Sequence, residues 1–168
     1  INVWELIQLA NHHPRVNILS PGPGVGGHCI AVDPWFIIHR DPKNAKIIKA
    51  AREINIYKTE WVIEKIKNTA LGFEKTNGKK PIIGCFGLAF KPNIDDLRES
   101  PALHIAKQLK LDGYKILAVE PNIENHSDFE IVSQEEAMKD GDIFTMLVGH
   151  KEFEKLNLKT SLDFCGIL

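Results

Sequence analysis

The chain has 168 residues, of which 43% are hydrophobic and 26% charged, as in an ordinary globular protein with one good-sized core. Its net charge of −1 gives no general attraction for nucleic acid or an anionic membrane, and no apolar run approaches the ~20 residues that span a bilayer. The three cysteines are odd in number and far apart, which is not the pattern of a disulfide framework, so we expect the reducing cytoplasm.

The first part of the chain is predicted to be helical. Apolar residues recur at helical spacing over about residues 1–11, without a capping residue or an initiating Met before them, which suggests a piece cut from a longer protein. A loop is expected over 12–35, followed by a long amphipathic helix over about 43–72. The lysine-rich stretch 74–81, with its Gly and Pro, is interpreted as a polar linker.

Beyond that linker, short apolar runs alternate with helical patterns. We expect strands at 82–88, 114–120, 142–148 and 161–168, a short one at 131–132, and helices at about 100–111, 134–141 and 150–156. Strands alternating with helices of this length are typical of a parallel, doubly wound sheet. The predicted fold class is therefore α/β, with a helical region over 1–73 and a Rossmann-like domain over 80–168.

Residues 21–35 read PGPGVGGHCIAVDPW, in which positions 22–27 match the dinucleotide-binding string G-x-G-x-x-G. A true fingerprint needs a buried strand directly before the first glycine and a helix that opens at the last one. Here the preceding NILS is too short and polar-ended for such a strand, and Pro34 stops the segment that follows. The context argues against a phosphate cradle.

Cys29 follows these glycines directly and is the candidate nucleophile. A partly exposed thiol becomes reactive when nearby donors or positive charge favour its thiolate, and glycines let backbone N–H groups approach a substrate. Asp33 is near enough in sequence to orient a water or to assist proton transfer. A buried cysteine in a glycine-rich turn is an equal alternative from these residues alone. A zinc site of His12, His13, His28 and Cys29 fits no usual spacing, so no metal is expected.

Two long motifs give the chain a family resemblance. The string GPGVGGHCIAVDPW and residues 84–101, GCFGLAFKPNIDDLRESP, resemble the two signatures of the UDP-glucose/GDP-mannose dehydrogenase family. HPRVNIL at 13–19 and AVDPWF after the cysteine most resemble its UDP-N-acetyl-D-mannosamine dehydrogenase branch. The likeness runs from Asn2 to the end of the chain, and it covers only the last part of the family's central helical dimerisation region and its C-terminal UDP-sugar domain. The N-terminal NAD domain and the helix with the family's catalytic lysine are absent, so the resemblance implies an enzyme portion that is inactive alone.

The resemblance also implies a chemistry. Family enzymes oxidise the primary alcohol at C6 of a nucleotide sugar twice and reduce two NAD, giving a uronic acid nucleotide sugar for surface polysaccharide. Cys29 would capture the intermediate aldehyde as a thiohemiacetal, which the second oxidation converts to a thioester. Water then releases the carboxylate, and Asp33 matches the family aspartate that assists proton handling.

The remaining site residues carry over from the family motifs. The resemblance implies substrate contacts from His13, Arg15, Gly26 and Lys91, and NAD contacts from His28 and Arg98. His13 and Arg15 correspond to family residues that reach the substrate of the partner subunit in a homodimer. Lys91 and Arg98 lie in a charged loop that could simply be solvated, but this loop follows a buried strand end, where doubly wound sheets place ligands.

Several alternatives stay open at this stage. Glu120, at the end of the second strand, sits where a Rossmann acid would bind a ribose, but the first strand leads into FGLAFKPN rather than a glycine fingerprint, so Glu120 is a weak candidate. The chain could also be a non-catalytic UDP-sugar-binding or dimerisation fragment, or part of a UDP-glucose-type enzyme of the same family.

Overall fold

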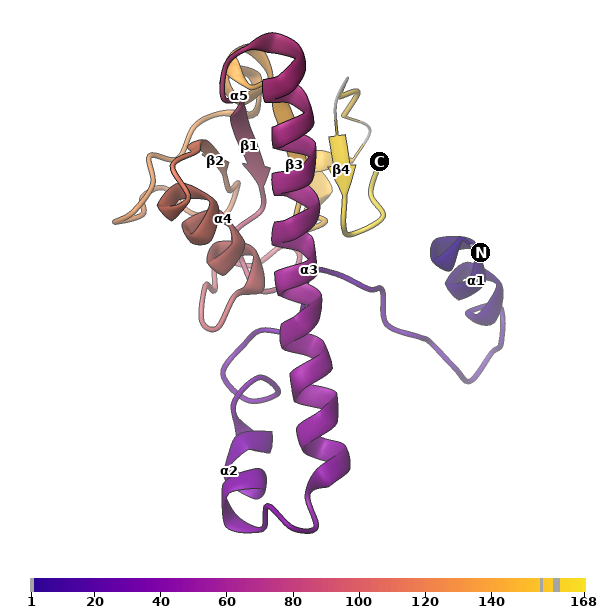
Figure 1. Ribbon diagram of the computed structural model, residues 1–168. Helices are drawn as coiled ribbons and strands as arrows, with labels where there is room; N and C mark the ends of the chain where they lie inside the picture. Colours follow the sequence, from indigo (N-terminus) through magenta and orange to yellow (C-terminus); the bar gives the residue numbers. More distant parts are fainter. Residues whose placement is uncertain (1, 155, 159–160) are drawn as a thin grey trace.

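The computed structural model describes residues 2–154, 156–158 and 161–168, and Figure 1 shows a four-stranded sheet beside one very long helix. The helices are α1 (Val3–Ala10), α2 (Asp33–Arg40), α3 (Lys46–Asn77), α4 (Pro101–Leu111), α5 (Gln134–Asp140) and the 3₁₀ helix η1 (Lys151–Phe153). The strands are β1 (Ile82–Phe86), β2 (Lys115–Val119), β3 (Ile143–Met146) and β4 (Ser161–Asp163).

All strand pairs of this sheet are parallel, in the order β2-β1-β3-β4. β1 lies at the centre, with Ile83 opposite Ile116 of β2 and Ile143 of β3. The order reverses between β1 and β3, which is the topological switch point of a doubly wound sheet. The predicted α/β fold with a parallel sheet is confirmed.

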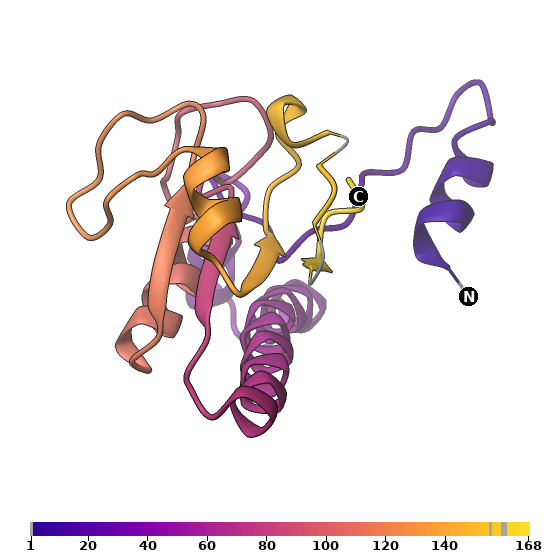
Figure 2. The ribbon, with the colours of Figure 1, turned by 90° about the horizontal axis from the view of Figure 1, so that it is seen from above.

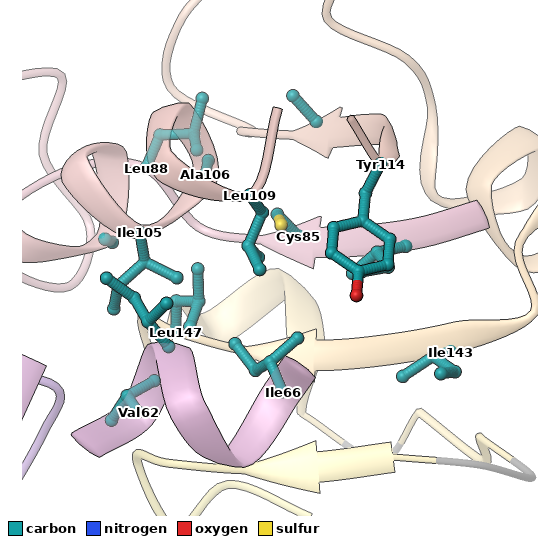
Figure 3. Packing of buried hydrophobic residues seen from close by; sticks show 14 of the residues in the cluster. Val62, Ile66, Cys85, Leu88, Ile105, Ala106, Leu109, Tyr114, Ile143 and Leu147 are labelled. Atoms are coloured by element: carbon teal, nitrogen blue, oxygen red, sulfur yellow. The ribbon is translucent and has the colours of Figure 1, made fainter. Parts of the chain in front are cut away.

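Each face of the sheet carries its own hydrophobic core, because alternate residues of a strand point to opposite faces. Ile83 and Cys85 of β1 belong to the cluster on the side of α3 and α4. Figure 3 shows Cys85 in this cluster with Ile66 and Leu109. Phe86 faces the other way, toward a second cluster beneath α5 and η1. Figure 2 shows α3 and α5 on opposite sides of the sheet. Both faces are covered, as an all-parallel sheet requires.

The helical region differs from the sequence prediction in two places. α2 begins at Asp33, inside the predicted loop 12–35, because Pro34 occupies its first turn, where the missing N–H of proline costs nothing. α3 runs to Asn77, through the first part of the predicted linker, and ends at Gly78 in the left-handed conformation with φ of 68°. The second half of α3 is part of the sheet core, since Val62 and Ile66 are fully buried there.

The sheet region also contains less regular structure than expected. The predicted helix over 150–156 is only the 3₁₀ turn η1, with residue 155 outside the described residues, and the predicted strand at 131–132 is a single bridge from Ile131 to Ala118. β4 stops at Asp163 because its carboxylate turns the chain, accepting the backbone N–H groups of Cys165, Gly166 and Leu168.

α1 lies at the periphery of the molecule in Figure 1, joined to residues 21–32 by an extended segment. Its side chains Leu6 and Leu9 are 55% and 67% exposed. The ring of Trp4 rests on Gly166, where an added Cβ would lie 2.5 Å from it. Among the described residues, no helix is long and apolar enough to cross a membrane.

Candidate functional site

The glycine loop, defined as residues 21–32, is fastened to α3 by two hydrogen bonds. The N–H of Val25 donates to Oδ1 of Asn55 over 3.0 Å, and the hydroxyl of Thr59 donates to the carbonyl of Pro23 over 2.9 Å. Thr59 is buried. Two adjacent turns of α3 thus fix the path of the loop before it reaches the cysteine.

The same loop packs closely against the loop that follows β1, defined as residues 87–100. A Cβ on Gly26 would lie 2.5 Å from the carbonyl oxygen of Glu99 and 2.7 Å from Cβ of Phe90. Gly27 has φ of 87°, and its N–H donates to the carbonyl of Arg98 over 2.9 Å. These glycines are required where two segments of the protein touch, whatever substrate contact Gly26 makes.

Cys29 is exposed and lies in the turn that leads into α2. Its carbonyl accepts the N–H groups of Val32 and Asp33, at 3.0 and 2.8 Å, so the helix is already forming at the cysteine. The carboxylate of Asp33 is exposed in the first turn of α2, where a negative charge is favoured by the helix dipole. The alternative of a buried cysteine in a glycine-rich turn is therefore wrong.

Lys91 and Arg98 are both exposed on the 87–100 loop. The guanidinium of Arg98 binds the Asp96 carboxylate through Nε and Nη2, at 3.0 and 2.6 Å, and this hydrogen bonding lowers the pKa of Asp96 to about 2. The pKa of Arg98 is raised, first by the same hydrogen bonding and also by the negative charge of Asp96. The two sequence motifs meet in space, through the hydrogen bond from the Gly27 N–H to the Arg98 carbonyl.

Glu120 does not face an open ribose site. Its side chain is buried, and Oε2 accepts the N–H groups of Leu88 and Ala89 at 2.7 and 3.0 Å. Oε1 accepts the N–H of Asn122 at 3.1 Å. Burial opposes ionisation, but the hydrogen bonds from His150 and from these backbone groups outweigh it and lower the pKa of Glu120 to about 2. The carboxylate of Glu120, the weak candidate for ribose binding, is thus already paired with hydrogen-bond donors of its own chain.

His150 completes this network and was not singled out by the sequence. It is fully buried directly after the β3 run, and its Nε2 lies 3.1 Å from Oε2 of Glu120. Its Nδ1 accepts the N–H of Asn93 over 2.9 Å. The only sequence signal was a histidine at the carboxyl end of a buried strand, the edge where such sheets bind ligands.

His13 and Arg15 are not brought to this site. Both are exposed in the segment between α1 and the glycine loop, where the N–H of Arg15 donates a local hydrogen bond to Nδ1 of His13 over 3.3 Å. Figure 1 shows this segment on the far side of α3 from α4. The structure therefore unites Gly26, His28, Cys29, Lys91 and Arg98 on two touching loops and leaves His13 and Arg15 outside them.

A cleft of about 260 Å³ lies between the glycine loop, α3 and the start of α4. Val25, Arg52, Glu99 and His104 are among the residues that line it, and Nε of Arg52 is buried there without a hydrogen-bond partner in the described part of the chain. Both the glycine loop and the 87–100 loop border this cleft, but Cys29, Lys91 and Arg98 are not among its lining residues.

Comparison with known proteins identifies the family. Residues 1–57 match the central domain of the UDP-glucose/GDP-mannose dehydrogenase family, and residues 84–165 match the UDP binding domain of the same family. The chain belongs to this family. The resemblance predicted from the two motifs is confirmed.

Individual relatives agree with this family assignment. The chain is 51% identical to a UDP-N-acetyl-D-mannosamine dehydrogenase of Campylobacter jejuni, over 98% of this chain and 41% of that protein. It is 49% identical to an NDP-N-acetyl-D-galactosaminuronic acid dehydrogenase of Ralstonia solanacearum, over 94% of this chain and 37% of that protein. The structure of a UDP-N-acetyl-mannosamine dehydrogenase from Staphylococcus aureus superposes with a TM-score of 0.79 at 38% identity, over 100% of this chain and 41% of that one. The chain thus spans about two-fifths of the length of these relatives.

Proposed function

We propose that this chain is the substrate half of a nucleotide-sugar 6-dehydrogenase that oxidises UDP-N-acetyl-D-mannosamine to the corresponding uronate with two NAD. The observation that carries the proposal is the exposed Cys29, which follows by two residues the hydrogen bond from Gly27 to Arg98 that joins its loop to the 87–100 loop. The UDP binding domain of the family lies in this chain, and relatives near 50% identity are UDP-N-acetyl-D-mannosamine dehydrogenases.

In the proposed reaction, a primary alcohol becomes a carboxylate in two oxidations, and NAD, when bound, accepts one hydride in each. The Sγ atom of Cys29 bonds to the aldehyde carbon after the first oxidation, and the thiol proton passes to the aldehyde oxygen, giving a thiohemiacetal. Loss of a hydride and a proton converts this to a thioester. Water then attacks the thioester carbon and Asp33 takes one proton from it; the C–S bond breaks, the carboxylic acid leaves, and Asp33 returns that proton to the departing thiolate of Cys29.

The sheet of this chain does not itself fit a dinucleotide. The position from which a Rossmann acid binds ribose belongs to Glu120, whose carboxylate is occupied by Leu88, Ala89 and His150. Contacts to NAD from this chain are therefore proposed only for the exposed His28 and Arg98, with the remainder supplied by the family's NAD domain.

UDP binding to the isolated chain is the first test. We assign Lys91 to the UDP-sugar because it is exposed on the loop that follows the central strand, and a cation there suits a phosphate, carbonyl or hydroxyl oxygen. Calorimetry should detect UDP binding that Lys91→Ala weakens at least tenfold, while Lys139→Ala, an exposed lysine on α5, serves as the matched control. Absence of UDP binding would contradict the substrate-domain assignment.

The second test uses a longer protein that includes an NAD domain. With NAD and UDP-N-acetyl-D-mannosamine it should form NADH, and Cys29→Ser should abolish formation of the carboxylate because an alcohol side chain gives no thioester. NADH formation from UDP-glucose instead would place the chain in a UDP-glucose-type enzyme. UDP binding without NADH from any nucleotide sugar would favour a non-catalytic binding or dimerisation module.

We further propose a homodimer formed through the helical region. Large apolar side chains are exposed along α2 and the first half of α3, among them Phe36 at 69%, Ile47 at 85% and Ile54 at 68%. Exposed apolar side chains of this size favour burial against a partner, and in the proposed dimer the outlying His13 and Arg15 would face a second subunit. Sedimentation should show a dimer that Ile47→Lys dissociates, whereas Leu111→Lys, 80% exposed at the end of α4, should leave it intact.

The proposed compartment is the cytoplasm, and the proposed pathway is polysaccharide biosynthesis. Cys29, Cys85 and Cys165 are all free thiols, which suits a reducing compartment. A nucleophilic thiol must also stay reduced to act. The uronic acid nucleotide sugar is a building block for surface polysaccharide.

A further inference from the structure

Two buried ionisable side chains on this sheet have no part in the proposed chemistry. Glu120 follows β2 and His150 follows β3, and both side chains are completely inaccessible to solvent. They meet at the carboxyl edge of the sheet, over 3.1 Å between Nε2 and Oε2. Burying such a pair costs free energy unless every donor and acceptor has a hydrogen-bond partner. The partners of this pair therefore indicate its structural role.

What this pair holds is the 87–100 loop, at two separate points. The base of the loop is bound by Glu120, which accepts the N–H groups of Leu88 and Ala89. The far side is bound by His150, whose Nδ1 accepts the N–H of Asn93. Lys91 lies midway between the two anchored points. The backbone position of Lys91 is therefore set by Glu120 and His150, which are far from it in the sequence and bind the loop on either side of it.

The hydrogen-bond directions fix the roles within the pair. Because Nδ1 of His150 accepts from a backbone N–H, the ring proton of the neutral imidazole lies on Nε2 and donates to Glu120. The carboxylate accepts all of its contacts, including the N–H of Asn122. An amide in place of the carboxylate would turn an NH₂ group toward these donors, so an isosteric Gln cannot replace Glu120.

The backbone at the anchored tip is held in a conformation that it would not adopt alone. Asn93 has φ of 61°, in the left-handed region that non-glycine residues rarely occupy. Its Oδ1 accepts the N–H of Lys151, so Asn93 is bound by two consecutive residues of the β3 connection. Such conformations persist where the surroundings over-determine them, and they cluster at functional sites.

We propose that Glu120 and His150 are positioning residues for the substrate: they fix the 87–100 loop through its backbone and thereby place the ammonium group of Lys91 for the nucleotide. This inference rests on the proposed binding of UDP by that loop. It gives a positioning role to Glu120, an acid at the place where the acid of a dinucleotide-binding sheet contacts a ribose.

The decisive experiment compares two substitutions of His150 in the full chain, with UDP as the probe. His150→Phe keeps the ring volume and the contact with Phe153 but removes the acceptor for Asn93, whereas His150→Asn keeps an acceptor at the Nδ1 position and loses volume. Calorimetry should show at least tenfold weaker UDP binding for the Phe variant and a smaller loss for the Asn variant. Thr145→Val is the control, since it removes a buried hydrogen bond from the same sheet, to Gly84, away from the loop.

A purely structural role predicts a different ranking. UDP affinities that followed the melting temperatures of the variants, with Thr145→Val weakened as much as His150→Phe, would overturn the proposal. If the His150 variants do not fold, the exposed Asn93 supplies a second pair. Asn93→Gly keeps the N–H and tolerates positive φ and should bind UDP nearly as well as the wild type, whereas Asn93→Ala should bind at least several-fold more weakly. Equal affinities of the Gly and Ala variants would contradict the anchor at the tip.

Amide hydrogen exchange separates this proposal from the proposed function. His150→Phe should raise exchange at Lys91 and Asn93 at least tenfold and leave Gly84 of β1 unchanged, with no ligand present. Loop amides that exchange as slowly as in the wild type would refute the positioning role. A wild-type chain that shows the exchange effect but binds no UDP would refute the proposed function and leave the loop anchor established.

Discussion

Replacing Gly26 by alanine tests the docking of the glycine loop on the 87–100 loop. The new Cβ would lie 2.5 Å from the carbonyl oxygen of Glu99 and 2.7 Å from Cβ of Phe90, whereas ordinary contact begins at 3.4 Å. Both obstacles are backbone or Cβ atoms that cannot rotate away. The loops must therefore separate by roughly 1 Å, and overpacking of this kind costs about 1–3 kcal/mol.

Gly22 provides a matched control in the same loop. A Cβ at this position has nothing within 4 Å, and its φ is not in the left-handed region. Gly22→Ala should be neutral or should stabilise the fold by about 0.4–1 kcal/mol, because alanine restricts the unfolded chain. The two variants should therefore differ by at least about 1 kcal/mol in the free energy of unfolding.

Urea denaturation measures this difference, through the midpoint at constant m-value. Gly26→Ala should also change the rate at which a small alkylating reagent modifies Cys29, because separating the loops moves the cysteine relative to Arg98. A Gly26→Ala variant as stable as Gly22→Ala, with unchanged alkylation of Cys29, would refute the docking of the two loops as the reason for glycine at this position.

Two further predictions follow from the thiols and from the buried acid. Iodoacetamide at neutral pH should modify Cys29 before the other two cysteines, as measured by peptide mass spectrometry. Cys29 is exposed, whereas burial raises the pKa of Cys85 to about 12 and also raises the pKa of Cys165. Earlier modification of Cys85 or Cys165 would contradict this assignment. Because the folded pKa of Glu120 is lowered to about 2, its contribution to stability should be complete above the ordinary glutamate pKa of 4.5 and be lost as the pH falls toward 2. Roughly 3 kcal/mol is involved, at 1.36 kcal/mol per pKa unit. Glu120→Gln should be less stable at neutral pH and should flatten the pH dependence of stability in this window; unchanged pH dependence would argue against an ionised Glu120.

The sheet could be predicted from the sequence because its strands are continuous apolar runs separated by helical patterns. The helix boundaries of the first part of the chain were harder to predict, because the residues that mark them are compatible with either the start or the end of a helix. Pro34 was interpreted as the end of a segment, but proline is equally suited to the first turn of a helix, and α2 begins at Asp33. The lysines after Glu74 suggested a linker, yet α3 continues to Asn77 because a polar last turn is no obstacle to a helix.

The residues of the two motifs were also predictable, but their mutual arrangement was not. The bond from Gly27 to Arg98 and the pair of Glu120 with His150 join residues far apart in the chain, and no local pattern specifies such partners. A buried histidine and an exposed one look alike in a single sequence. Only the fold reveals that the acid at the end of β2 faces inward to Leu88 rather than outward to a ligand.

The glycine string at 22–27 has the spacing of a dinucleotide fingerprint and the opposite structural meaning. In a fingerprint the missing Cβ lets the backbone approach a pyrophosphate, whereas at Gly26 it admits the carbonyl of Glu99. Gly27 then binds the carbonyl of Arg98, and the nucleophile follows two residues later. Substitutions at these glycines should therefore change the placement of Cys29 relative to the 87–100 loop, and with it the capture of the aldehyde, before they change affinity for NAD.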